Sequence, residues 1–296
     1  MNSSDSCVLS VDAGGTSLKA ALVVNGSVRM DSFFSIPVRS DGSADEIKSA
    51  YAALGKAAGI YEARFGLTIH HVSVCIPGPF DYPGGRCLMK HKYQSVYGMN
   101  LRPWIEEGIG RPLPICFLHD STAFLLGAAA SLTEEECSSL CGVIIGTGLG
   151  FASMADGRIL EQPSGGPGIS IFGRPYLGKT AEDYVSRRGI IYRYRQLSPA
   201  CDGEIEVKEI ADRARAGSRE ACAVFHETGE HLAAILLPVV QENGFRHMLL
   251  GGAISKSADL FLPDLKKGLK PVHITVEPAR DPDMAPLLGA AQYSFN

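Results

Sequence analysis

Residues 8–19 read VLSVDAGGTSLK and lead directly into an apolar run, AALVV, at residues 20–24. This pattern predicts a strand, a glycine turn and a second strand. Gly14 and Gly15 have no Cβ, so the backbone between the strands can bend sharply and approach a ligand closely. A run of backbone N–H groups in such a turn suits an anion such as a phosphate.

Three side chains around this turn offer chemistry. Asp12 ends the first apolar strand, Thr16 adds a hydroxyl and Lys19 adds a positive charge. An acid in that position needs a partner, and a hydrated Mg²⁺ ion on a nucleotide phosphate is one. A simple hairpin in which Asp12 and Thr16 satisfy turn amides accounts for the same residues, and Lys19 then lies solvated at the strand edge.

The pattern of strand, glycine turn and strand occurs twice in the chain. Residues 142–157 read GVIIGTGLGFASMADG, again a strand, a glycine turn, a strand and a two-residue hairpin signal. The spacing from Thr16 to Asn25 equals the spacing from Thr147 to Asp156. We therefore expect an internal duplication, two domains and a cleft between them. The candidate phosphate-binding residues of the second turn are Gly146, Thr147, Gly148 and Gly150.

Length and composition describe an ordinary globular protein. The chain has 296 residues, of which 45% are hydrophobic and 20% charged, and a net charge of −4. Nucleic-acid-binding proteins normally carry a basic surface, so we expect no nucleic-acid partner. A basic cluster (Arg187, Arg188, Arg193, Arg195) is interpreted as the solvated face of one helix. The polar first residues and the lack of a long apolar run predict a cytoplasmic protein without a membrane partner.

The eight cysteines are scattered, which is typical of small core residues in a reducing compartment. They are Cys7, Cys75, Cys87, Cys116, Cys137, Cys141, Cys201 and Cys222. Cys137 and Cys141 are four residues apart, but no second pair of ligands completes a zinc site. We expect no structural zinc.

Helices are predicted from capping signals and apolar periodicity. Ser43 and Glu46 form a capping box before an apolar stripe that reaches Phe65. Further helices are expected at 123–132, from Thr180 to about Arg195, at 218–243 and from Ala285. A loop-rich segment, 161–178, is typical of a lid or binding loop.

Two further strand ends carry candidate site residues. Strand 71–76 ends in the rigid turn Pro77-Gly78-Pro79, and strand 111–118 leads into His119 and Asp120, with Ser121 and Thr122 as caps for the helix that follows. Open α/β sheets place reactive side chains at such strand ends. A plain turn, an ordinary half-buried histidine and a helix-capping aspartate explain these residues equally well in isolation.

A third glycine turn follows strand 246–250. Gly251 and Gly252 end the strand and open a helix. Because these two glycines have no side chains, a flat adenine ring could lie against their backbone.

Taken in order, these motifs resemble the ROK family (repressors, uncharacterised reading frames and sugar kinases) within the sugar kinase, actin and heat-shock ATPase superfamily. The matching segments span nearly the whole chain: 12–16, 76–79, 119–120, 146–150, 251–255 and 288–291. The resemblance implies an α/β fold of two ribonuclease-H-like domains. The N-terminal sugar-kinase domain is expected at 1–122, with helix 284–296 packing back on it, and the nucleotide-binding domain at 123–283.

The same resemblance implies an ATP-dependent sugar kinase that uses Mg²⁺. Asp120 falls at the position of the family's general base, and Glu182 matches a glutamate that binds sugar hydroxyls. Gly78 and His119 are expected beside the sugar. Asp12 is expected to hold Mg²⁺ through water. The three glycine turns and Lys19 are expected to bind ATP. A homodimer is one option that the resemblance allows.

The chain departs from the family pattern at three places. His119 replaces the usual Asn before the catalytic Asp. Residues 166–170, GPGIS, replace the Gly-Glu-x-Gly-His motif and so lack its sugar-binding Glu and zinc-binding His. Residues 172–176 occupy the position of the family's zinc loop and contain no cysteine. These departures predict a zinc-free member with an altered sugar pocket, whose sugar and phosphorylated hydroxyl the sequence does not identify.

Two other classes fit the resemblance. A sugar-responsive regulator would carry a DNA-binding segment ahead of the kinase-like part, whereas Val8 begins the first strand almost at once. A degenerate sugar-binding protein would explain the missing Glu and His. Retention of Asp12, Asp120 and all three glycine turns favours a kinase.

Overall fold

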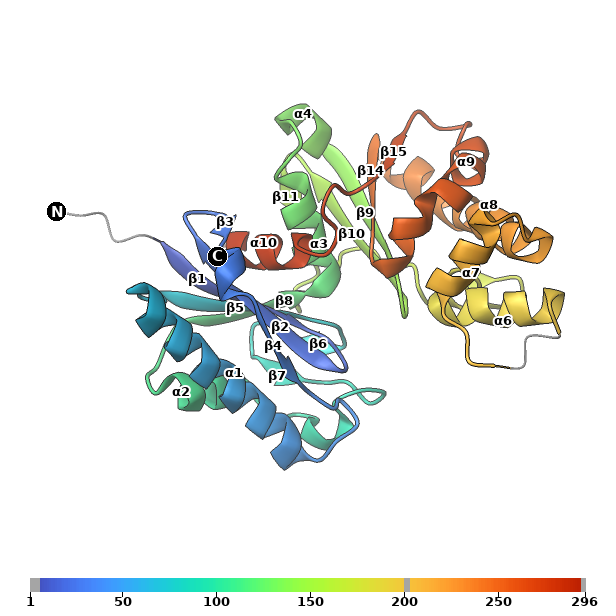
Figure 1. Ribbon diagram of the computed structural model, residues 1–296. Helices are drawn as coiled ribbons and strands as arrows, with labels where there is room; N and C mark the ends of the chain where they lie inside the picture. Colours follow the sequence, from blue (N-terminus) through green and yellow to red (C-terminus); the bar gives the residue numbers. More distant parts are fainter. Residues whose placement is uncertain (1–5, 200–202, 294–296) are drawn as a thin grey trace. The chain divides into compact units, whose positions relative to one another are not determined.

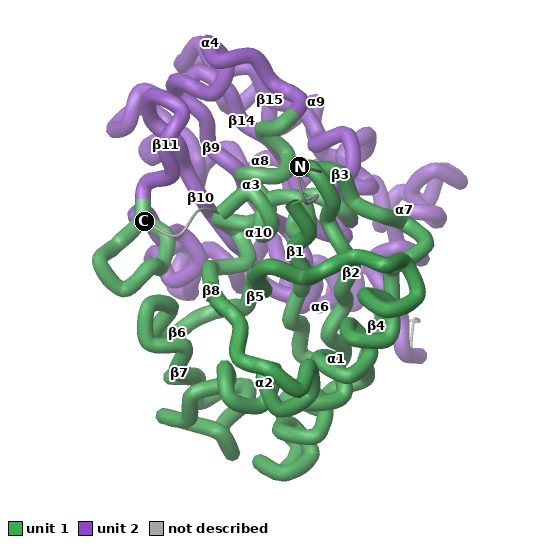
Figure 2. Tube along the Cα trace, turned by 90° about the vertical axis from the view of Figure 1, so that its left-hand side faces the viewer, with its two compact units in different colours: residues 1–130, 161–167, 284–296 green, residues 131–160, 168–283 purple. Residues whose placement is uncertain are grey.

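The computed structural model describes residues 6–199 and 203–293, and they fall into two compact units (Figure 2). Unit 1 contains the chain up to Ala130, residues 161–167 and the chain from Met284. Unit 2 contains Ser131–Leu160 and Gly168–Asp283. Each unit has its own sheet and its own apolar core, which a chain of this length can supply twice.

Unit 1 is built on a six-stranded sheet with the order β3-β2-β1-β5-β8, in which β4 also pairs with β2. The parallel strands β1, β5 and β8 are buried runs, as expected for a sheet covered on both faces. Their carboxyl ends share one edge of the sheet, and the turn from β1 into antiparallel β2 lies at the same edge. The strands are β1 (Cys7–Ala13), β2 (Ser17–Val24), β3 (Ser27–Val28), β4 (Phe34–Pro37), β5 (His71–Ile76) and β8 (Ile115–His119).

Helices cover both faces of this sheet (Figure 1). On one face lie α1 (Ala44–Phe65) and α2 (Arg102–Ile109). The predicted capping box is confirmed: the Ser43 side chain accepts from Glu46 N–H and the Glu46 side chain accepts from Ser43 N–H. The predicted apolar stripe of α1 packs into the core of unit 1.

The other face of the sheet carries α3 (Asp120–Ala129) and α10 (Ala285–Gln292). The two helices approach so closely that a Cβ at Gly127 would lie 1.9 Å from Ala285 O, and one at Gly289 would lie 1.8 Å from Ala123 O. The Ser10 hydroxyl on β1 donates to Leu287 O at 2.5 Å. The close packing predicted for the small residues after Ala285 is confirmed, and its partners are α3 and β1.

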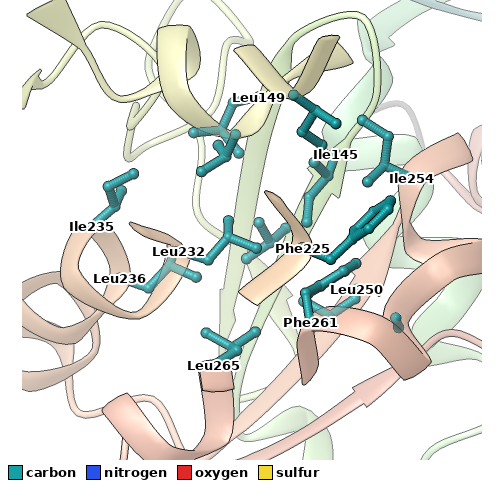
Figure 3. Packing of buried hydrophobic residues seen from close by; sticks show 14 of the residues in the cluster. Ile145, Leu149, Phe225, Leu232, Ile235, Leu236, Leu250, Ile254, Phe261 and Leu265 are labelled. Carbon is teal, nitrogen blue, oxygen red and sulfur yellow. The ribbon is translucent and has the colours of Figure 1, made fainter. Parts of the chain in front are cut away.

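Unit 2 has a five-stranded sheet with the order β11-β10-β9-β14-β15. Its strands are β9 (Ser139–Ile145), β10 (Leu149–Ala155), β11 (Arg158–Ile159), β14 (His247–Gly251) and β15 (Thr275–Pro278). The helices are α4 (Glu134–Cys137), α5 (Glu182–Val185), α6 (Arg187–Leu197), α7 (Val207–Arg215), α8 (Arg219–Asn243) and α9 (Ala258–Gly268). Figure 3 shows the core, in which Phe225 and Leu232 of α8 meet sheet residues such as Leu250 and helix residues such as Phe261.

Short elements complete the chain. They are the strands β6 (Phe80–Asp81), β7 (Arg86–Cys87), β12 (Pro175–Tyr176) and β13 (Lys179–Thr180), and the 3₁₀ turns at Met30–Ser32, Gln94–Val96 and Ala253–Ser257.

The duplication predicted from the sequence is confirmed in the topology of the two sheets. In both units, one strand runs antiparallel to the first strand of the unit and two strands run parallel to it: β2-β1-β5-β8 matches β10-β9-β14-β15. In each unit the second strand of the hairpin is followed by two residues with positive φ. They are Asn25 (50°) and Gly26 (78°) after β2, and Asp156 (50°) and Gly157 (72°) after β10. These are the dihedrals of the predicted two-residue hairpin turn.

Three details of the predicted elements are wrong. The strand predicted from Arg111 begins only at Ile115, because Pro112 and Pro114 cannot donate ladder hydrogen bonds. Helix α3 begins at Asp120 and has His119 as its N-cap, so Ser121 and Thr122 lie in its first turn and are buried.

The third error concerns the helix expected from Thr180 to about Arg195. Thr180 does bond to Asp183, as the capping signal predicts. The chain then breaks at Ser186, which is extended (φ −78°, ψ 171°) and separates α5 from α6. The Arg187 N–H donates to Gly146 O at 2.8 Å instead of continuing the helix, so a tertiary hydrogen bond replaces a helical one.

The basic cluster and the cysteines lie where the sequence placed them. All four arginines are on α6 and partly exposed, but each is paired, for example Arg193 with Glu227 and Arg188 with Asp183. Of the described cysteines five are buried, Cys137 and Cys222 are half-buried, and Cys201 lies outside the described residues. Across residues 6–199 and 203–293, none of the helices combines the length and apolarity that crossing a bilayer would need.

Candidate functional site

Asp12 lies at the carboxyl edge of the unit 1 sheet. In the ladder it pairs with Lys19 of β2 on one side and with Cys75 of β5 on the other. Burial raises the pKa of Asp12, the nearby negative charge of Asp120 raises it further, and the Lys19 charge and the Cys75 thiol offset part of this rise. Asp12 is therefore a half-buried acid near a second acid, a place where a cation is favourable.

The turn after Asp12 is held by backbone and side-chain contacts from distant segments. The Tyr93 hydroxyl donates to Gly14 O at 2.6 Å, and Ser40 N–H donates to Gly15 O at 3.0 Å. A Cβ on Gly15 would lie 3.2 Å from the Ser40 hydroxyl and 3.9 Å from Lys92 Cε. The turn is thus rigid and narrow, with Thr16 exposed at its tip and a lysine beside it.

His119 and Asp120 end β8 and begin α3 at the same edge. His119 Nδ1 lies 2.9 Å from Asp120 Oδ1, and the two side chains are 18% and 45% exposed. The Ser121 N–H lies 2.7 Å from Asp120 Oδ1 and 3.2 Å from His119 Nδ1. Oxygen Oδ1 of Asp120 is therefore held by its neighbours, while the side chain remains accessible to solvent.

The charge state of Asp120 follows from opposing effects. Burial on its own raises the pKa of this carboxyl, but the His119 charge, hydrogen bonds from His119 and Ser121 N–H, and the Lys92 charge together outweigh burial. The pKa of Asp120 therefore lies below that of an ordinary aspartate, whereas the pKa of Asp12 lies above it. Two acids pushed in opposite directions in one site are typical of functional sites.

The turn at Gly78 adjoins the His119 ring. A Cβ at Gly78 would lie 3.3 Å from the Tyr82 hydroxyl and 3.6 Å from His119 Cδ2. The Tyr82 hydroxyl donates to Ile76 O at 3.2 Å, and its ring meets His119 edge-on, with centroids 6.0 Å apart. Glycine is needed here because a side chain would push the turn off this ring pair.

A second acid, Glu161, lies near His119 and was not predicted. It belongs to the short segment 161–167 that unit 1 includes. Tyr293 donates to Glu161 Oε2 at 3.0 Å, whereas Glu161 Oε1 is buried and has no hydrogen-bond partner among the described residues. Burial raises the pKa of Glu161, and the Tyr293 hydrogen bond and the His119 charge oppose that rise.

The residues of this edge fit a magnesium ion bound to phosphates. Mg²⁺ takes oxygen ligands, keeps several waters and commonly uses only one or two carboxylates plus substrate phosphates. Asp12 supplies a half-buried carboxylate, with Lys19 as its neighbour across the ladder. The described residues contain no cluster of three or more His, Cys, Asp or Glu side chains arranged for a metal.

Unit 2 places its own candidates together. The Gly146 N–H donates to Gly148 O at 3.0 Å within the turn, and Glu182 Oε2 accepts from Leu149 N–H at 2.9 Å. Gly148 leaves room for that carboxylate, since a Cβ there would lie 2.6 Å from Glu182 Oε2.

The third turn packs on the second. Gly252 has φ 82°, and a Cβ on it would lie 2.4 Å from Ile145 O, just before the Gly146 turn. Gly251 pairs with Ile144 in the sheet. The backbone of both turns is therefore brought to one edge of unit 2, with Thr147 exposed and Gly150 at the start of β10.

The predicted residues thus form two groups. Unit 1 holds Asp12, Gly14, Gly15, Thr16, Lys19, Gly78, His119 and Asp120, and unit 2 holds Gly146, Thr147, Gly148, Gly150, Glu182, Gly251 and Gly252. Sequence reasoning missed Lys92, Tyr93, Tyr82, Glu161 and Tyr293. The only signal was the basic and aromatic run 90–93, KHKY, in a long connection.

Comparison with known proteins decides the family. The sequence profile described as "ROK family" matches residues 8–170, more than half of the chain. The chain belongs to the ROK family. The predicted resemblance is confirmed, and the match includes both glycine turns and the His119-Asp120 pair.

Relatives within the family span nearly the full chain. N-acetylmannosamine kinase of Pasteurella multocida (strain Pm70) is 24% identical over 96% of this chain and 94% of its own length. DNA-binding transcriptional repressor Mlc of Escherichia coli (strain K12) is 22% identical over 74% of this chain and 59% of its own length. The family therefore includes both enzymes and regulators.

The fold is shared with solved ROK structures. A ROK family glucokinase from Streptomyces griseus, in complex with glucose and AMPPNP, superposes with a TM-score of 0.79 at 22% identity, covering 97% of this chain and 98% of the glucokinase. The predicted α/β fold of the actin-like ATPase type is confirmed.

Proposed function

We propose that this ROK protein is an ATP-dependent sugar kinase that phosphorylates a hydroxyl of a hexose or hexose derivative, with Asp120 as general base. One observation carries the proposal. Asp120 has a depressed pKa and a half-exposed side chain at the edge where a rigid glycine turn and the half-buried acid Asp12 also lie. The relatives named as N-acetylmannosamine kinases and glucokinase support the substrate class.

The reaction would need little covalent chemistry from the protein. The sugar hydroxyl loses its proton to the Asp120 carboxylate as its oxygen forms a bond to the γ-phosphorus, and the bond from that phosphorus to the bridging oxygen of ADP breaks. ADP leaves with the electron pair, and Asp120 later releases the proton to solvent. A base in this role needs hydrogen-bond reach to the hydroxyl and must be ionised, and the depressed pKa of Asp120 meets the second condition.

The remaining roles follow from charge and backbone. The turns at 14–16 and 146–148 would hold phosphate oxygens with backbone N–H groups, and Gly251 and Gly252 would border adenosine. Asp12 would hold Mg²⁺ through water, and the ion would neutralise phosphate charge when bound. Lys19, opposite Asp12 in the ladder, would add a positive charge beside the phosphates.

We assign the sugar to the domain predicted at 1–122 with the C-terminal helix, and the nucleotide mainly to the domain predicted at 123–283. Gly78, His119 and Asp120 would contact the sugar. Glu182 would add a sugar contact, as the family resemblance implies, although its Oε2 already accepts from Leu149 N–H. Oxygen Oε1, 3.8 Å from Arg188, is then the atom available for that contact.

The experiment is a coupled ADP-release assay with the purified protein, MgATP and a panel of hexoses and N-acylated hexosamines. The proposal predicts turnover with at least one sugar. Binding of a sugar by calorimetry, together with turnover on none of the panel, would instead favour a sugar-binding regulatory protein without kinase activity. Among the relatives, Mlc is named as a transcriptional repressor.

A further inference from the structure

His119 has one nitrogen that faces three groups at once. Its Nδ1 lies 2.9 Å from Asp120 Oδ1, 2.8 Å from Ser121 Oγ and 3.2 Å from Ser121 N. These contacts compete for one nitrogen, because a protonated Nδ1 can only donate and an unprotonated Nδ1 can only accept. With a proton on Nδ1, the ring donates to the Asp120 carboxylate and to the Ser121 hydroxyl oxygen, while Ser121 N–H donates to Asp120 Oδ1 at 2.7 Å.

The alternative arrangement is unfavourable. An unprotonated Nδ1 would accept from Ser121 but would set its lone pair against a carboxylate oxygen 2.9 Å away. Two acceptors at that distance, with no hydrogen between them, repel each other. The contacts therefore assign the Nδ1 proton, which the ring orientation alone does not show.

Other charged and titratable groups surround this pair from every neighbouring element. Asp12 of β1 and Lys92 of the long connection act on Asp120, and Tyr82 lies edge-on to the His119 ring. Glu161 comes from segment 161–167, which is fixed in unit 1 by Tyr293 and by the contact of Gly165 with the Tyr82 ring. His119 thus contacts the half-exposed acid Asp120, and its charge also acts on the half-buried acid Glu161.

We propose that His119 is a positioning residue whose Nδ1–H fixes the direction of the Asp120 carboxylate, and that the charge of Glu161 supports the imidazole in this role. The inference rests on the proposed kinase function, and it goes beyond that function by giving Asp120 two partners. Holding Oδ1 with two donors leaves the other oxygen, Oδ2, directed to the sugar hydroxyl. The ring also keeps the base ionised in a site where burial favours its protonation.

The test compares His119→Ala with His119→Asn. Alanine removes both donor and charge, whereas an asparagine amide places an N–H donor near the position of Nδ1 and still caps α3 well. We expect His119→Ala to lower kcat by about 10- to 100-fold, in the range of a misplaced catalytic group, with a smaller change in KM for the sugar. His119→Asn should recover much of the lost kcat.

The pH profile separates positioning from a structural role. Because His119 lowers the pKa of Asp120, the acidic limb of kcat/KM should move to higher pH in His119→Ala and by a smaller amount in His119→Asn. Glu161→Gln should reduce kcat/KM several-fold, and its effect should be absent or reduced in the His119→Ala background, since residues of one electrostatic network couple. Glu277→Gln, which removes the carboxylate 3.1 Å from His247 in unit 2, is the matched control and should leave the profile unchanged.

A second readout needs no turnover. A ¹³C NMR titration of the Asp120 carboxyl should show a higher pKa in folded His119→Ala than in the wild-type protein, so the positioning role is tested even if no sugar is phosphorylated. A wild-type kcat, an unmoved acidic limb and an unmoved carboxyl titration in His119→Ala would overturn the proposal. Strict additivity of His119→Ala and Glu161→Gln would remove Glu161 from it.

Discussion

The two glycine turns share a backbone plan but differ in their side chains. In each hairpin the last ladder pair before the turn is apolar, Ala13 with Leu18 in unit 1 and Ile145 with Leu149 in unit 2. The next pair is Asp12 with Lys19 in unit 1, but Ile144 with Gly150 in unit 2. The two hairpins thus share a glycine-turn framework, and of the two only the hairpin of unit 1 carries an acid paired with a lysine.

The two turns also differ in the contacts that hold them in place. The turn of unit 1 has four residues between the last paired positions and is fixed from outside by Tyr93 and Ser40. The turn of unit 2 has three, and is fixed by Glu182 and by the Arg187 N–H, which donates to Gly146 O. Unit 1 therefore carries the site of chemistry in this account, whereas unit 2 offers backbone alone to the phosphates.

The largest difference between the turns is predicted at the position that Asp12 holds in unit 1 and Ile144 holds in unit 2. Asp12→Asn should lower kcat/KM by about 10²- to 10³-fold through lost charge stabilisation, while Ile144→Val in unit 2 should have little effect. Steady-state kinetics with MgATP measures both. Equal losses in the two variants would contradict the division of roles.

Asp12→Asn should also stabilise the ligand-free protein at neutral pH. The folded pKa of Asp12 is raised, so the stability linked to its protonated form is present at acid pH and is lost as the pH rises through that pKa. Asparagine mimics the protonated form and avoids the loss. The difference in Tm should shrink towards about pH 4, near the usual aspartate pKa, and a Tm gain that is independent of pH would contradict this cause.

A smaller difference is predicted between two glycines of the unit 2 turn. A Cβ on Gly146 meets no described atom within 4 Å, whereas a Cβ on Gly148 meets Glu182 Oε2. Gly146→Ala should therefore keep the wild-type Tm and yet weaken ATP binding by about tenfold, roughly 1.4 kcal/mol, because the methyl group obstructs the nucleotide. Gly148→Ala should lower both Tm and affinity. Calorimetric titration with AMPPNP checks this, and unchanged affinity in Gly146→Ala would remove the turn from the nucleotide site.

The smallest effects are predicted where the halves are alike. Gly26 and Gly157 follow the two hairpins with φ of 78° and 72°, and an added Cβ on either meets no described atom within 4 Å. Each alanine variant should thus lose about 1 kcal/mol of unfolding free energy through left-handed strain alone. Urea unfolding measures this, with activity unchanged. A clearly larger loss at one position would show that the two hairpins are not equivalent.

The sequence was most informative where local patterns decide structure. The apolar runs, the paired hairpins, the Ser43 capping box and the strand ends at Asp12 and Asp120 all follow from short-range rules. Local rules failed at Ser186, where a tertiary hydrogen bond from Arg187 divides a helix, and at Ser121, where a histidine takes the cap position.

The surroundings of the site could not be predicted for a similar reason. Tyr93 and Lys92 arrive from a long connection, and Glu161 and Tyr293 are 132 positions apart in the chain. No periodicity links such residues to His119 or Gly14, because their proximity is a property of the packed unit. Family membership supplied what pattern reading alone could not, namely the role expected of Asp120.

The most direct test of the central claim is a single-turnover measurement on Asp120→Asn, with the variant saturated with MgATP and with the sugar that wild type phosphorylates best. Losing the base should slow phosphoryl transfer by about 10²- to 10⁴-fold, while AMPPNP binds with nearly wild-type affinity. A transfer rate close to that of wild type would show that the edge of unit 1 does not deprotonate the sugar through Asp120.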